Sequence, residues 1–100
     1  MSFRKRVVVI VKIPHTLAIF PISIVQEITN LSARQIRYYE EQGLIAPERN
    51  KGNQRIFSLK DIEVLLEIKS LIDQGVNIAG IHAIYSKKQK ENDDTINDQT

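Results

Sequence analysis

This sequence contains no cysteine and no tryptophan, and only four glycines, three prolines and two histidines. Without cysteine, neither a disulfide framework nor a thiolate metal site can form. The histidines, His15 and His82, stand far apart without ligand-like neighbours, so we expect no metal site. The sequence also has no Gly-rich phosphate loop, no nucleophile motif and no pair of catalytic carboxylates. We therefore predict a protein that is not an enzyme and carries no cofactor.

A long apolar run is missing as well. The β-branched run at residues 7–11 follows a basic start, but Lys12 interrupts it and no small-residue cleavage site follows, which argues against a signal peptide. The run is also far too short to cross a bilayer, so we expect no membrane partner. We interpret residues 1–19 as an N-terminal extension, either a dimerisation strand that pairs with a second copy or a disordered segment.

Length and charge bound the remaining possibilities. With 100 residues and 42% hydrophobic content, the chain can build one small core, which indicates a single domain. Its formal net charge of +2 is unevenly distributed. Residues 31–60 carry six basic side chains against three acidic ones, whereas residues 61–86 carry four acidic and one basic. The basic half is therefore the candidate for binding nucleic acid.

A short basic helix is predicted at the start of this basic half. Ser32 followed by Gln35 forms a capping box, so a helix should begin at Ala33. Gly43 can adopt the left-handed conformation that closes a helix, which places the end near Gln42.

The predicted helix has two different faces. At about 100° per residue, one arc collects the polar side chains Arg34, Arg37, Tyr38 and Glu41. Ile36 and Tyr39 lie on the opposite side and can anchor the helix to a core. Arginine matches the acceptor edge of guanine or a phosphate, and a tyrosine hydroxyl can reach a backbone oxygen. Taken alone, such a helix is more often just a solvated surface; the next segment favours DNA binding.

That segment is predicted to be a hairpin with a basic tip. Five basic or amide side chains surround Gly52, namely Arg49, Asn50, Lys51, Asn53 and Arg55. Ile45 precedes them, and Ile56 and Phe57 follow, as in two strands joined by an exposed loop. A helix followed by a basic hairpin is typical of a winged helix-turn-helix. We therefore predict a mainly α protein with a small β-hairpin, built to bind DNA.

The other predicted elements complete this fold. Residues 22–29 form a short supporting helix, and Asn30 and Leu31 form the turn before Ser32. After the wing, Ser58 and Asp61 make a second capping box that opens a long helix ending at Gly75. A last helix follows, capped by Asn77. We assign residues 20–86 to the winged helix-turn-helix domain and residues 87–100 to a polar, disordered tail.

From Phe20 to Tyr85 the sequence resembles the MerR family of transcription regulators. The resemblance runs through FPISIV, LSARQIRYYEEQGLI, GNQRIFS and LLEIKSLIDQGVN. Within the family the chain is similar to the nitrogen-control branch, the GlnR/TnrA-type repressors of glutamine synthetase genes. This resemblance implies a cytoplasmic homodimer that represses transcription from an inverted repeat in double-stranded DNA. It also assigns recognition-helix roles to Arg34, Gln35, Arg37 and Tyr38, and wing roles to Asn50, Lys51, Asn53 and Arg55.

The branch implies a second partner, because glutamine-bound glutamine synthetase acts on such regulators through their C-terminal tail. More distant family members add a coiled-coil helix and an effector domain, and we expect neither here. Two other functions stay open at this point. One is an excisionase-like or architectural winged-helix protein that bends DNA. The other is a module that acts mainly by binding glutamine synthetase.

Overall fold

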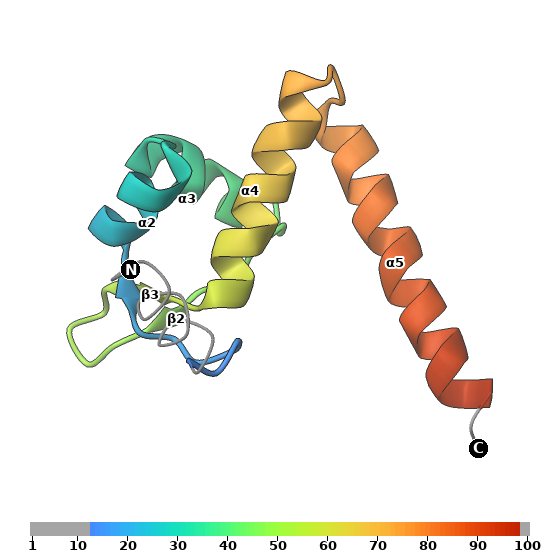
Figure 1. Ribbon diagram of the computed structural model, residues 1–100, viewed down its shortest axis with the longest axis horizontal. Helices are drawn as coiled ribbons and strands as arrows, with labels where there is room; N and C mark the ends of the chain where they lie inside the picture. Colours follow the sequence, from blue (N-terminus) through green and yellow to red (C-terminus); the bar gives the residue numbers. More distant parts are fainter. Residues whose placement is uncertain (1–12, 99–100) are drawn as a thin grey trace, which may run out of the picture. The chain divides into compact units, whose positions relative to one another are not determined.

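The computed structural model describes residues 13–98. Its elements follow in the order β1 (Phe20–Pro21), α2 (Ile22–Thr29), α3 (Ala33–Glu41), β2 (Glu48–Arg49), β3 (Arg55–Phe57), α4 (Leu59–Asp73) and α5 (Ile78–Asp98) (Figure 1). The predicted mainly helical class with a small β component is confirmed. The chain divides into two compact units, one ending at Leu65 and the other starting at Leu66. This division falls inside α4, and inside the stretch predicted to be one domain.

The first unit contains a three-stranded antiparallel sheet rather than the predicted two-stranded hairpin. Its strand order is β1-β3-β2, so β3 lies in the middle. On one side Phe20 pairs with Phe57, and on the other Arg49 pairs with Arg55. Pro21 has no N–H to give to a ladder, and the outer position of β1 tolerates this loss. The hairpin of β2 and β3 is the predicted wing.

Residues before β1 also belong to this unit. The Ile19 N–H donates to the Phe57 carbonyl oxygen at 3.0 Å, and the Lys60 N–H donates to the His15 carbonyl oxygen at 3.0 Å. The His15 ring also contacts the Glu63 carboxylate. The first unit therefore starts before residue 20, where the domain was predicted to begin. The expected dimerisation strand falls on residues 1–12, which lie outside the described part of the chain.

A tight turn joins α2 to α3. The Thr29 hydroxyl is buried and donates to the Val25 carbonyl oxygen at 2.7 Å, while it accepts from the Leu31 N–H at 3.3 Å. Asn30 closes α2 in the left-handed conformation, with φ of 58°. Asparagine tolerates this region because its short amide side chain can bond locally. The predicted helix-turn-helix pair is thus confirmed, with its angle fixed by a buried hydroxyl.

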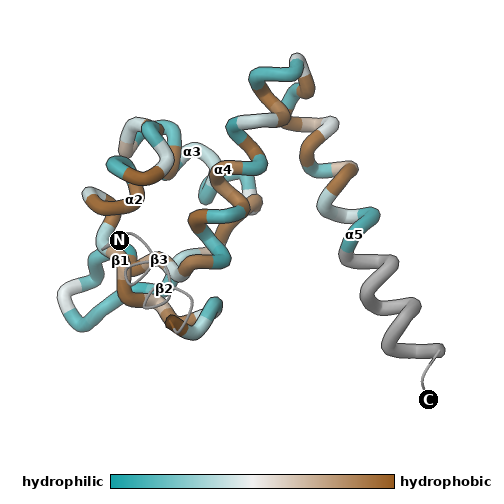
Figure 2. Tube along the Cα trace, viewed as in Figure 1, coloured by the Kyte–Doolittle hydropathy of each residue, from teal (hydrophilic) through white to brown (hydrophobic). Residues whose placement is uncertain are grey.

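The core of the first unit is built from α2, α3, β3, the start of α4 and the loops between them. Its buried apolar side chains are Val25, Leu31, Ile36, Tyr39, Ile45, Phe57, Ile62 and Leu65. Phe57 is fully buried at the middle strand of the sheet. The hydropathy colouring shows the opposite character in the loop between β2 and β3, which is hydrophilic and projects away from the helices (Figure 2). The sheet therefore contributes apolar packing at its centre and a polar loop at its tip.

The predicted helix caps of the second half are also confirmed. Ser58 and Asp61 form the capping box, with the two backbone-to-side-chain bonds at 3.0 and 3.1 Å. Gly75 has φ of 95° just after α4. At the start of α5, Asn77 Oδ1 accepts from the Gly80 N–H at 2.8 Å. Within residues 13–98, no helix is long and apolar enough to span a bilayer.

In the second unit a polar cluster links α4 to α5. Lys88 Nζ bonds Glu67 Oε1 at 2.9 Å and lies 5.4 Å from the centre of the Tyr85 ring. The bond from Lys88, and then the neighbouring Tyr85, lower the pKa of Glu67. Burial, followed by the Glu67 carboxylate, raises the pKa of Tyr85. The Tyr85 hydroxyl is buried, which disfavours its charged form, and the nearby Glu67 carboxylate acts in the same direction.

The end of α5 lies in the stretch for which the sequence predicts a disordered tail. The helix continues to Asp98, so residues 87–98 have helical backbone where the polar composition predicted disorder. The reason lies in local propensity, because the sequence after Gly80 contains neither glycine nor proline to stop the helix. A polar composition excludes a buried core in this segment, but it does not exclude a helix.

Candidate nucleic-acid interface

The helix α3 starts and stops as its sequence predicts. The Gln35 N–H donates to Ser32 Oγ at 3.1 Å, and the Ser32 N–H donates to Gln35 Oε1 at 2.9 Å. These two bonds satisfy donors that the first turn of a helix leaves open. At the other end Gly43 has φ of 77°, a conformation that strains residues with a Cβ. The helix is therefore fixed at both ends by local chemistry.

The two faces of α3 are also confirmed. Ile36 and Tyr39 are 0% and 5% exposed, whereas Arg34, Arg37 and Tyr38 face solvent. The rings of Tyr38 and Tyr39 lie 5.7 Å apart at 59°, so the exposed tyrosine leans on the buried one. The helix thus presents a phenol and two guanidiniums on a rigid support. Among residues 13–88, whose side chains the structure describes, Arg34 and Arg37 find no hydrogen-bond or ion-pair partner, which leaves their donors open to a ligand.

The predicted recognition residue Gln35 has a structural task. Its side-chain oxygen accepts the Ser32 N–H, so the amide is held against the helix terminus. Gln35 is exposed, and it lies beside Arg34 in the first turn. Its contribution to an interface therefore includes fixing the start of α3, which sets where Arg34 projects.

The wing loop is shaped by its asparagines. Asn50 Oδ1 accepts from the Gln54 N–H at 2.9 Å, and the Asn53 N–H donates to the Asn50 carbonyl oxygen at 2.9 Å. Asn53 has φ of 63°, in the left-handed region that asparagine adopts more readily than most residues. Lys51 is exposed in the turn that these bonds close. Two of the predicted wing residues therefore build the loop, and Lys51 is carried by it.

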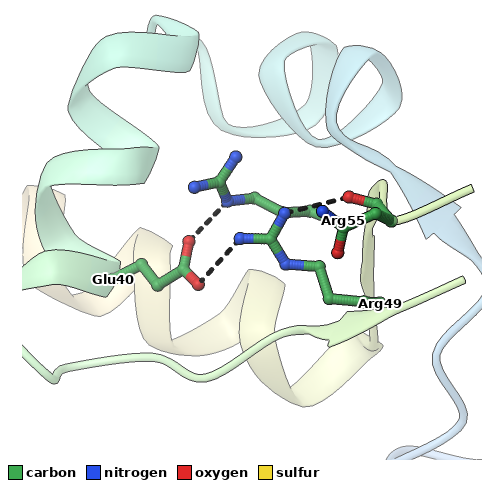
Figure 3. Close-up of polar contacts among 4 residues, drawn as sticks. Glu40, Arg49 and Arg55 are labelled. Carbon is green, nitrogen blue, oxygen red and sulfur yellow. Dashed lines mark hydrogen bonds and ion pairs between the residues drawn. The ribbon is translucent and has the colours of Figure 1, made fainter.

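A carboxylate of α3 binds both strands of the wing (Figure 3). Arg55 Nε bonds Glu40 Oε1 at 2.5 Å, and Arg49 Nη2 lies 3.7 Å from Glu40 Oε2. Arg49 also donates from Nη1 to the Asn53 carbonyl oxygen at 3.0 Å. The side chains of Glu40 and Arg55 are each only 23% exposed. We call Glu40, Arg49 and Arg55 the wing clasp, because they join the recognition helix to the hairpin.

Sequence reasoning missed this cluster. It gave Glu40 no role, and it counted Arg49 among the side chains of the hairpin tip without assigning it a wing role. The sequence places Arg49 and Arg55 on either side of the hairpin tip. With the five-residue loop of the structure, the two arginines lie directly opposite one another. Like charges directly opposite one another are destabilising unless an acid lies between them. Arg55 was predicted to be a wing residue, and in the structure its side chain is partially buried and paired with Glu40.

A basic hollow lies between α3, the wing and the start of α2. It has a volume of about 410 Å³ and is lined by Arg37, Arg49 and Arg55 together with Ile22 and Ser23 of α2, among others. Its lining residues include these three arginines and no acidic residue, so the local charge is positive. Glu40 engages Arg49 and Arg55, so Arg37 supplies the open donors of this hollow for an anionic group.

An anchored helix with exposed arginines, preceded by a tight turn and followed by a basic hairpin, defines a winged helix-turn-helix protein. The sequence comparison is more specific. Residues 20–88 match the family described as MerR HTH family regulatory proteins, and the chain belongs to this family. Its members are regulators rather than enzymes, and the helix-turn-helix implies DNA as the partner. The family expected from the sequence motifs is therefore confirmed.

Individual relatives are also transcription regulators. The chain is 56% identical over 73 residues to the HTH-type transcriptional regulator GlnR of Bacillus anthracis, an overlap that covers 73% of this chain and 57% of GlnR. It is 43% identical over 72 residues to TnrA of Bacillus subtilis, covering 72% and 66%. It is 38% identical over 61 residues to MlrA of Salmonella typhimurium, covering 61% and 24%. The chain thus spans little more than half the length of GlnR.

Proposed function

We propose that this chain is a sequence-specific, cytoplasmic transcription regulator that represses glutamine synthetase and other nitrogen metabolism genes. Residues 20–86 form its DNA-binding domain. The observation that carries the proposal is the rigid face of α3, where Arg34 and Arg37 are exposed beside a basic wing. The similarity to GlnR and TnrA supports the assignment to nitrogen control.

The reading of bases falls to α3. In this proposal α3 enters the major groove, and the forked donors of Arg34 and Arg37 bond the O6 and N7 acceptors of guanine. Each such contact is worth about 1–3 kcal/mol of discrimination against the wrong base. Tyr38 reaches a phosphate oxygen through its hydroxyl. Gln35 supports this face by holding the first turn in place.

The wing acts on the DNA backbone. Lys51 is exposed in the loop and forms a phosphate contact, which adds affinity for any sequence. Asn50 and Asn53 keep this loop in its shape through the turn that they build. Arg55 holds the strand side of the wing through its bond to Glu40.

We propose a homodimer on an inverted repeat as the working form. Two copies related by a two-fold axis place one α3 in each of two major grooves, about 34 Å apart along the duplex. Glutamine synthetase is the proposed second partner, by analogy with the nitrogen-control branch that the chain resembles.

A salt-titrated binding curve tests the proposal. Three duplexes are compared, namely an inverted repeat, its half-site and a scrambled sequence of equal length. We expect tight binding to the full repeat with the mass of two chains bound. Arg37→Ala should reduce the preference for the repeat, whereas Lys51→Ala should weaken all three duplexes equally and flatten the salt dependence by about one phosphate contact.

Two results would contradict the proposal. Equal, steeply salt-dependent binding to all three duplexes would favour an architectural protein. Equal effects of Arg37→Ala and Lys51→Ala on repeat and scrambled DNA would refute the separation of base reading from backbone binding. Capture of glutamine synthetase with and without glutamine tests the second partner separately.

A further inference from the structure

We propose that Glu40 is a specificity-determining residue that never touches DNA: it holds Arg55 and Arg49 off the phosphates and keeps the wing in register with α3. The inference rests on the proposed DNA-binding function. It assigns Arg55 to positioning rather than to direct DNA contact.

The geometry of the wing clasp carries this inference. Glu40 uses both carboxylate oxygens, one for Arg55 at 2.5 Å and one for Arg49 at 3.7 Å. Its partners lie on different strands, so one side chain of α3 fixes both β2 and β3 (Figure 3). Arg49 then continues to the Asn53 carbonyl oxygen at 3.0 Å. The chain of contacts runs from the recognition helix to the loop that carries Lys51.

Charge gives the clasp its second role. Arg49 and Arg55 are paired across the hairpin and line the same basic hollow as Arg37. Without Glu40, the two strand arginines would repel one another and turn to the nearest available anion. On DNA that anion is a phosphate. Contacts to phosphates exist at every sequence, so released arginines would strengthen non-specific binding most.

The register of the helix depends on the same contact. Phosphate contacts set where a protein sits on the duplex, and base contacts read the sequence from that position. The wing sets the position of the protein on the duplex through its phosphate contacts. If the wing shifts relative to α3, Arg34 and Arg37 no longer lie opposite the bases that they read. Loss of Glu40 therefore lowers specificity in two ways: the base contacts of α3 become weaker, and non-specific binding to phosphates becomes stronger.

The test uses the full chain and a matched control. Glu40→Gln removes the charge of the clasp while keeping the side-chain size. Glu27→Gln removes the same charge from the supporting helix α2, where Glu27 is exposed and pairs with no arginine among the described side chains. Arg55→Met removes the arginine itself. Affinity for the inverted repeat and for the scrambled duplex is measured at several salt concentrations, and unfolding is measured without DNA.

Glu40→Gln should steepen the salt dependence by a slope of about 0.9 for each arginine that reaches a phosphate. It should also reduce the preference for the repeat roughly tenfold, the size of one lost base contact. Glu27→Gln should raise both affinities together and leave the preference unchanged. Arg55→Met should leave the slope of the wild-type protein unchanged. A flatter slope for Arg55→Met, or equal behaviour of the two glutamine variants, would overturn the inference.

Unfolding separates this inference from the proposed function. In a cycle of Glu40→Gln, Arg55→Met and the double variant, the clasp predicts coupling of about fivefold or more in the unfolding equilibrium constant. Coupling without selective DNA binding would refute the proposed function alone. Selective binding without coupling would refute the clasp alone.

Discussion

Replacing Gln35 with glutamate should separate the two tasks of the first turn of α3. The Gln35 side-chain oxygen accepts the Ser32 N–H at 2.9 Å, and a glutamate carboxylate can accept the same bond. A negative charge near a helix N-terminus adds about 0.3–1 kcal/mol of stability. Gln35→Ala removes the acceptor, and at this exposed site the lost bond costs about 0.5 kcal/mol. The glutamate variant should therefore be more stable than the alanine variant by about 1 kcal/mol.

Thermal unfolding measures this difference. In a domain of this size, 1 kcal/mol corresponds to a shift in Tm of about 4–8 °C. DNA binding should change in the opposite sense. If Gln35 lies near the phosphates, the new charge costs about 1 kcal/mol at a separation of 4 Å in water, which is roughly fivefold in affinity. We expect the glutamate variant to melt higher and to bind the inverted repeat more weakly.

Each half of this prediction can fail by itself. If Gln35→Glu melts at or below Gln35→Ala, the capping box does not stabilise α3 as the geometry implies. If Gln35→Glu binds the repeat like the wild-type protein, the side chain lies away from the DNA backbone. Gln35 would then cap α3 without being part of the DNA interface.

Asn53→Gly should keep the wing conformation, because glycine adopts a φ of 63° freely, and Asn53→Ala should cost about 1 kcal/mol or more; both are measured by urea unfolding. Equal stability of these two variants would contradict a conformational role for Asn53. Phe57→Ala should cost about 3–5 kcal/mol, because the ring is fully buried, and calorimetry should show a melting transition that is strongly lowered or lost. The bond from Lys88 lowers the pKa of Glu67 below its ordinary 4.5, so the pair stabilises the protein above that pH and loses this contribution as the pH falls through the lowered pKa. In urea unfolding, the advantage of the wild-type protein over Lys88→Met should therefore shrink as the pH falls below the ordinary pKa of 4.5, and an advantage independent of pH would refute this coupling.

The helix boundaries could be predicted from the sequence because their signals are local. Ser32 and Gln35 lie three positions apart, as do Ser58 and Asp61, and both pairs form the expected reciprocal bonds. Gly43 supplies the left-handed stop that its position indicated. The two faces of α3 followed from helical geometry alone, which needs no knowledge of distant residues.

The features that the sequence did not reveal, β1 and the wing clasp, depend on contacts between residues that are far apart in the chain. The strand β1 has only two residues, which is too short for any periodic pattern, and it exists because Phe20 lies opposite Phe57. The clasp was missed for the same reason, since Glu40 finds its arginines on the wing strands. The predicted disorder of residues 87–100 rests on polar composition and stays a prediction, beside a backbone that is helical to Asp98.

The position of β3 in the middle of the sheet has a consequence for synthesis of the chain. Residues of α2 and α3 can form their hydrogen bonds as soon as they leave the ribosome, because all partners are near in sequence. The wing must wait, since β3 is the last strand made and bonds both β1 and β2. Until Phe57 arrives, Phe20 has no partner strand, and the nascent protein has a helix pair without a finished wing. Competence to bind DNA should thus appear late and in a single step, when one strand closes both sides of the sheet.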